Sequence, residues 1–165
     1  MKFEYDDGGR AEAGYKVHTG DCVVRAIAIA TGIPYQKVYD NVNRMALENE
    51  GSYRRSSSRK GVHTKREWFK DYLKSLGFFW TEMPSEGCKI HLRDGEVPMR
   101  GIFILCLNKH LTVVKNGIIY DTYDPSNGGE KQVKGYWSRI KGPSIDNPTQ
   151  NFLLINNGIN EIEEI

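Results

Sequence analysis

The sequence lacks long apolar runs and has few cysteines. No segment approaches the roughly 18 consecutive apolar residues of a membrane-spanning helix, and residues 1–7 lack the charged-then-apolar layout of a signal peptide. Three cysteines leave one unpaired under any pairing, and they lie too far apart for a disulfide scaffold. These absences exclude a protein with helical membrane spans and a disulfide-rich secreted protein. They predict a cytoplasmic protein with reduced thiols and no membrane partner.

Internal repeats and proline- or glycine-rich linkers are also missing. A length of 165 residues suits one domain, and 39% hydrophobic with 27% charged residues is typical of a globular chain. We therefore expect a single domain over residues 1–165, with an extended lead-in over 1–20. The net charge of +2 does not by itself indicate binding to nucleic acid or to a membrane.

Positive charge is concentrated in residues 53–70, which hold seven basic residues against one acid. Residues 51–63 are rich in serine and arginine, which predicts a mobile basic loop. Charge runs are usually solvated faces, but such a segment can also contact an anionic partner. Arg54, Arg55 and Arg59 are therefore candidate contacts for a substrate or partner, with nucleic acid as one possible partner.

The first half of the chain is predicted to be helical. Asp21 is a favoured N-cap, and residues 22–30 are apolar around nearly the whole helical circumference, which predicts an interior helix that Gly32 ends. Pro34 suits the first turn of a second helix that runs to Glu48.

A capping-box pattern at Thr64 and Glu67 predicts a third helix, which ends at Gly77. After it the pattern changes to short β-prone runs. Helices followed by antiparallel strands indicate the α+β class. The predicted strands cover residues 78–81, 101–107, 111–115, 118–122, 133–140 and 152–155.

Asn116-Gly117 is the strongest hairpin signal in the chain, because a type I′ turn needs a positive φ at both central residues. A two-residue turn there places Lys115 opposite Ile118. Counting outward along both strands then places His110 opposite Tyr123.

The same register brings Asp121 close to His110. Asp121 falls opposite Thr112 and diagonal to His110, at about 7–8 Å between backbones, which is within reach of the side chains. Asp124 points to the other face. A slip of one residue would exchange the two aspartates, and a turn-opening aspartate beside a strand-end histidine is the competing structural interpretation.

Cys22 falls in the first turn of the predicted interior helix. Unpaired backbone N–H groups and the helix dipole favour a thiolate there. Arg25, three residues on, can lower the pKa of the thiol further or hold a substrate carboxylate. The alternative is that Cys22 is a small buried apolar residue and Arg25 a structural ion-pair partner. In the catalytic hypothesis Cys22 attacks, His110 moves the proton and Asp121 orients His110.

The order of these elements resembles papain-like cysteine peptidases, especially the bacteriocin-processing double-glycine peptidases. The shared features are Asp21-Cys22 opening a buried helix, His110 opening a strand and Asp121 ending the next strand. The chain also resembles an uncharacterised set of small phage and bacterial proteins over residues 20–137. That resemblance is carried by the segments 20–30, 87–92, 109–111 and 120–124.

The resemblance implies a papain-like α+β fold and acyl-transfer chemistry without a cofactor. The expected activity is hydrolysis of a peptide or isopeptide bond in a protein or peptide substrate, in a phage- or mobile-element-encoded protein that acts on a host protein. The same triad also serves acyltransferases and deamidases. Arg25, Arg54, Arg55, Arg59 and Tyr123 are the expected contacts with the substrate or partner.

One position departs from the papain-like pattern. Lys16 stands where those enzymes usually carry the glutamine that completes the oxyanion hole. Lys16, His18 or Thr19 can donate instead, with Asp21 assisting, and loss of one such donor costs about 10²–10³ in rate. The alternative from another class is a catalytically inactive module that binds a protein or nucleic acid through residues 53–70.

Two other cysteines are not expected to do chemistry. Cys88 and His91 have a ligand-like spacing, but a structural zinc needs four ligands and only His18, His63 and Cys106 remain to complete the set. We therefore predict no metal. Cys106 lies in an apolar run and is expected to be a core thiol.

Overall fold

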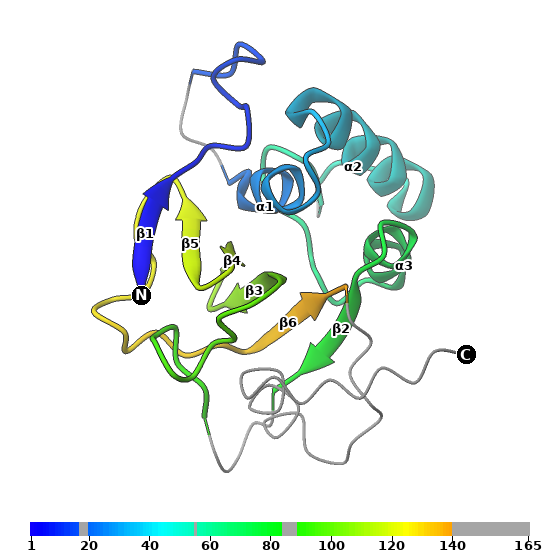
Figure 1. Cartoon of the computed structure of the whole chain (residues 1–165). Coiled ribbons are helices and arrows are strands. Elements are labelled where there is room, and N and C mark those ends of the chain that lie inside the picture. The colour runs from blue at the N-terminus through cyan, green and yellow to red at the C-terminus, as the bar shows by residue number, and fades with distance from the viewer. Residues whose placement is uncertain (17–19, 55, 84–88, 140–165) are drawn as a thin grey trace.

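The computed structural model describes residues 1–16, 20–54, 56–83 and 89–139. Within these ranges the chain forms three helices and one six-stranded mixed sheet (Figure 1), so the predicted α+β class is confirmed. The helices are α1 (Cys22–Thr31), α2 (Tyr35–Glu50) and α3 (Glu67–Ser75). The strands are β1 (Lys2–Tyr5), β2 (Phe79–Glu82), β3 (Ile102–Leu107), β4 (His110–Lys115), β5 (Ile118–Asp121) and β6 (Gly135–Ser138).

The strands lie in the order β1-β5-β4-β3-β6-β2, antiparallel except where β1 pairs in parallel with β5. β1 lies inside the lead-in that was expected to be merely extended. It is a four-residue edge strand with no fully buried side chain, so it carries little hydrophobic pattern. The predicted strand over 152–155 lies outside the described residues.

The predicted hairpin register is confirmed. Lys115 pairs with Ile118 across the turn, and Asn116 and Gly117 have φ of 48° and 77°, as a type I′ turn requires. A second tight hairpin precedes it, because Leu107 pairs with His110 across Asn108 and Lys109. His110 therefore begins β4 directly after a turn.

The helices cover one face of the sheet, and loop residues cover the other (Figure 1). α1 is buried along nearly its whole length, as its apolar sequence predicts. It packs with α2 and α3 against inward residues such as Ile104 and Val113. On the opposite face, Ile90, Leu92 and Val97 pack against the sheet in a second cluster. The start of α1 is thereby fixed against the sheet.

One of two predicted helix caps is wrong. Asp21 is the N-cap residue of α1, as predicted, but its side chain makes no capping hydrogen bond, because its carboxylate bonds to Arg25 and Tyr35 instead. α3 begins at Glu67 after Arg66, without a side-chain cap, so Thr64 does not start the helix.

The three consecutive serines of the predicted mobile loop are buried. Ser58 makes two hydrogen bonds: its backbone N–H donates to the Asn43 side chain, and its hydroxyl donates to the Tyr39 carbonyl. Ser56 donates to Glu50. These bonds attach this part of the loop to α2, while mobility of residues 51–63 stays a prediction.

No helix among the described residues is long and apolar enough to cross a membrane.

Candidate active site

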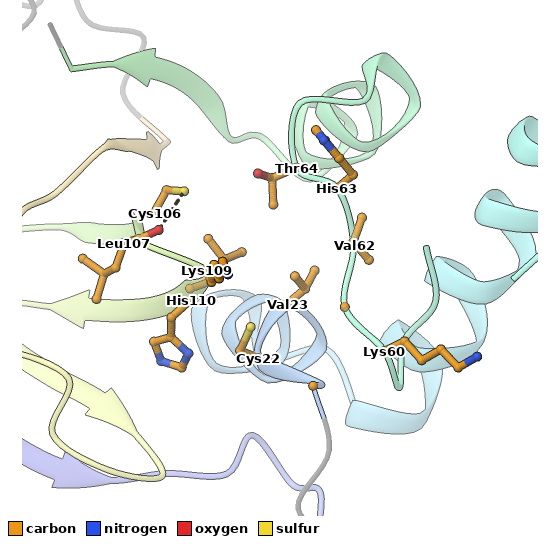
Figure 2. Close-up of a pocket in the computed structure, with 13 residues that line it drawn as sticks. Cys22, Val23, Lys60, Val62, His63, Thr64, Cys106, Leu107, Lys109 and His110 are labelled. Atoms are coloured by element: carbon orange, nitrogen blue, oxygen red, sulfur yellow. Dashed lines mark hydrogen bonds between the residues drawn. The ribbon is translucent and has the colours of Figure 1, made fainter. Parts of the chain in front are cut away.

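The start of α1 and the β4–β5 hairpin bring three predicted residues together. His110 opens β4 and Asp121 closes β5, and His110 Nε2 lies 2.7 Å from Asp121 Oδ2. Cys22 is the first residue of α1, and its side chain lies beside the His110 ring (Figure 2). Because Asp121 engages Nε2, Nδ1 is the ring nitrogen that remains for the thiol.

Cys22 and His110 shift each other's ionisation. Burial alone raises the pKa of the Cys22 thiol, but hydrogen bonding to His110 and to the Leu111 backbone, with the charges of His110 and Arg25, brings that pKa below its ordinary value. Burial likewise lowers the pKa of His110, but its bonds and charge interactions with Asp121 and Cys22 raise it to about 9. Both shifts favour the thiolate–imidazolium pair over the neutral thiol and imidazole.

Asp121 is almost completely buried, at 2% exposure. Burial raises the pKa of its carboxyl group, but His110, Arg25 and the Thr122 N–H outweigh this and lower it. Arg25 Nη1 donates to Asp121 Oδ1 at 2.7 Å, and the Thr122 N–H donates to the same oxygen at 2.7 Å. One carboxylate oxygen is thus held by the protein while the other faces His110.

Arg25 is itself buried, at 5% exposure. Its guanidinium also donates to Asp21 Oδ1 at 3.1 Å and to the Thr122 hydroxyl at 3.0 Å. Burial lowers the pKa of Arg25, but the two carboxylates more than restore it. These contacts match the interpretation of Arg25 as a structural ion-pair partner. Its predicted contact with a substrate would need an exposed guanidinium, and the Arg25 guanidinium is buried.

Asp21 is completely buried and lies at the far end of this network. It accepts a hydrogen bond from the Tyr35 hydroxyl at 2.7 Å, and Arg10 Nη1 lies 3.5 Å from it. Sequence analysis missed Arg10 and Tyr35 because nothing in the local pattern connects either residue to Asp21. Because the Asp21 oxygens contact only Arg25, Arg10 and Tyr35 in this network, the role of Asp21 is to hold the Arg25 guanidinium in place.

A cavity of about 420 Å³ opens beside Cys22. It lies between the loop that carries Val62 and Thr64 and the β3–β4 turn (Figure 2). Cys106 packs against the hydrophobic core as predicted, but it is only half-buried and also lines this cavity, because its place near the end of β3 puts the sulfur at the cavity wall. Burial raises the pKa of Cys106 despite a hydrogen bond with Thr64.

The remaining predicted contacts are dispersed. Tyr123 is 52% exposed and packs on the catalytic candidate His110, with ring centroids 5.1 Å apart. Arg54 and Arg59 are exposed, whereas Arg55 lies outside the described residues. Their roles stay predictions.

The structure describes only one of the three predicted oxyanion donors, Lys16. Lys16 is exposed and does not line the cavity beside Cys22. His18 and Thr19 lie outside the described residues. Two cations that sequence analysis did not select, Lys60 and Lys109, do line it. Sequence analysis could have identified Lys109 from its position directly before His110.

The described part of the chain contains no group of three His, Cys, Asp or Glu side chains able to hold a metal ion. His91, which the metal alternative requires, has Nδ1 3.1 Å from Glu96 Oε2. Its predicted companion Cys88 lies outside the described residues.

In comparisons with known proteins, no family model, curated protein or solved structure matches the chain.

Proposed function

We propose that this chain is a papain-like cysteine hydrolase that cleaves a peptide or isopeptide bond. The observation that carries the proposal is the buried His110–Asp121 pair at 2.7 Å, placed next to a helix-start cysteine whose thiol pKa is lowered. A nucleophile, a base and an orienting group within reach of one another form the arrangement that nucleophilic catalysis requires.

The chemistry follows from these positions. The Cys22 thiolate forms a bond to the carbonyl carbon of the substrate, and the C–N bond breaks as the proton on His110 Nδ1 passes to the leaving nitrogen. Water then attacks the thioester and gives a proton to His110. The C–S bond breaks, the acid leaves and the Cys22 thiolate is restored beside the His110 imidazolium. Asp121 holds the ring through Nε2 and stabilises the imidazolium throughout.

The oxyanion site has one donor in the backbone of α1. The Cys22 N–H lies at the helix start, where N–H groups have no partner within the helix. A second donor can come from Lys109, which lines the same cavity, or from the predicted His18 or Thr19. A buried network that includes Arg25 positions Asp121 from the same helix that carries Cys22.

Incubation with a proteome-derived peptide library tests the proposal. We expect new peptide termini with the wild-type protein and with Cys106→Ala, and none above background with Cys22→Ala. The matched control is informative because both cysteines line the same cavity, but only Cys22 adjoins His110. Mass spectrometry identifies the products.

The product mass also separates the alternatives with the same triad. Conversion of glutamine to glutamate indicates a deamidase, and a new amide linkage indicates an acyltransferase. Absence of every such product, or cleavage that persists in Cys22→Ala, contradicts the proposed hydrolase. The inactive binding module through residues 53–70 then becomes the better hypothesis, and action on a host protein stays a prediction.

A further inference from the structure

Two further cavities adjoin the one beside Cys22. A cavity of about 500 Å³ shares Thr64, Cys106 and Leu107 with it. Another, of about 570 Å³, shares Leu107, Lys109 and His110 with it, and shares Leu107 and Asn108 with the second cavity. We call the three together the lysine groove. All three cavities meet at Leu107 and Cys22 lines the first of them, so a chain that reaches Cys22 has further room in the two adjoining cavities.

The groove is strongly basic. Lys60 and Lys109 line the cavity beside Cys22, Lys131 joins Lys109 in the cavity of about 570 Å³, and the cavity of about 500 Å³ is lined by Lys65, Lys70, Lys89 and Lys134. Against these seven lysines stand two acids, Glu82 and Asp124. The surplus of five positive charges exceeds the +2 of the whole chain, so the rest of the protein is net acidic and the net positive charge lies in the lysine groove.

These lysines are largely free to meet a ligand. Lys70 forms an ion pair with Glu67 at 2.9 Å, and the other six form no ion pair with a described residue. Cations gathered in a cleft raise the local concentration of an anionic ligand and speed its association.

The cavity with four lysines also has an apolar floor. Met83, Leu107 and Val133 are buried and line this cavity. Convergent charges over a buried apolar surface suit a ligand that carries both carboxylates and apolar side chains.

We propose that the lysine groove binds a polypeptide segment rich in aspartate and glutamate next to the bond that Cys22 attacks. This inference rests on the proposed function and names its substrate class. A polypeptide is favoured over nucleic acid because the groove includes a thiol prepared for acyl chemistry, and its long cationic side chains are lysines rather than the planar arginines that suit phosphate.

The probes are two hexapeptides that end in an alanyl chloromethyl ketone, one with glutamates and one with glutamines at the other positions. The Cys22 thiolate displaces chloride, so that a C–S bond forms as the C–Cl bond breaks. We expect the glutamate probe to label Cys22 about tenfold faster at low salt, with the ratio falling as salt is added. Intact-mass spectrometry gives both rates, and iodoacetamide serves as the small neutral reference.

Charge reversal locates the effect. Lys65→Glu with Lys134→Glu is expected to bring the rate ratio close to one while leaving the iodoacetamide rate unchanged. The matched control reverses Lys37 and Lys74, which are exposed and outside the groove, and it is expected to keep most of the preference.

Three results overturn the inference. The first is equal labelling by both probes in the wild-type protein. The second is an equal loss of preference in the matched control, since net charge would then be the cause. The third is protection of Cys22 from iodoacetamide by a single-stranded oligonucleotide but not by the glutamate peptide. If instead iodoacetamide labels Cys22 no faster than Cys106, the proposed function itself fails.

Discussion

Replacing Arg25 with methionine is expected to lower the free energy of unfolding by about 3–5 kcal/mol, because it removes one partner of a buried ion-pair network. Arg25 bonds to Asp21 and Asp121, and both carboxylates are at most 2% exposed. Without the guanidinium, Asp21 keeps Arg10 at 3.5 Å and Asp121 keeps His110. Urea denaturation measures the change.

Arg44→Met is the matched control. Arg44 forms an ion pair with Glu48 at 2.9 Å, but both side chains are more than half exposed, so the same substitution is expected to cost less than about 1 kcal/mol. If Arg25→Met costs no more than Arg44→Met, the buried network does not stabilise the fold.

A second substitution, Asp21→Asn, is expected to recover part of the loss in the Arg25→Met background, since it removes a buried charge.

Replacing Asp121 with asparagine is expected to lower the pKa of His110 from about 9 toward its ordinary value of 6.5. The side chain keeps its size and an oxygen that can accept from Arg25, but the negative charge that favours imidazolium is gone. Since the general acid in the proposed mechanism is the imidazolium, activity in the wild-type protein is expected to fall as the pH rises through about 9. In Asp121→Asn that decline moves to lower pH.

Asp124→Asn is the control for this substitution, because Asp124 lies three residues on and accepts a hydrogen bond from the Ser126 N–H. Titration of the His110 ring by NMR separates the two variants. We expect the pKa of His110 to stay near that of the wild-type protein in Asp124→Asn. An equal fall in both variants, or a fall only in Asp124→Asn, contradicts the assignment of Asp121 as the orienting carboxylate.

Local sequence chemistry predicted the parts of the candidate site that short-range geometry controls. Asn116-Gly117 permits one tight turn, and that turn sets which residues of β4 and β5 are opposite. The placement of Asp121 beside His110 follows from it. Likewise, the apolar run after Cys22 predicted that the helix is buried.

Contacts between distant segments could not be predicted in this way. Arg10 and Tyr35 reach Asp21 only because the N-terminal segment and α2 both pack near the start of α1. Asp21 is the N-cap residue of α1, but a buried guanidinium four residues on takes its carboxylate, so the side chain makes no capping hydrogen bond. The lysine groove joins residues from loops and strands that are far apart in the chain.

The most direct test of the account is the ultraviolet absorbance of the Cys22 thiolate as a function of pH, obtained as the difference between the wild-type protein and Cys22→Ser. Cys106 is present in both samples and cancels. We predict that Cys22 ionises below the ordinary thiol pKa of 9.0, and that in the His110→Ala background its pKa rises above that value because burial then dominates. A thiol that titrates at or above 9.0 with His110 present, and that does not respond to removal of the imidazole, would show that the two groups share no proton.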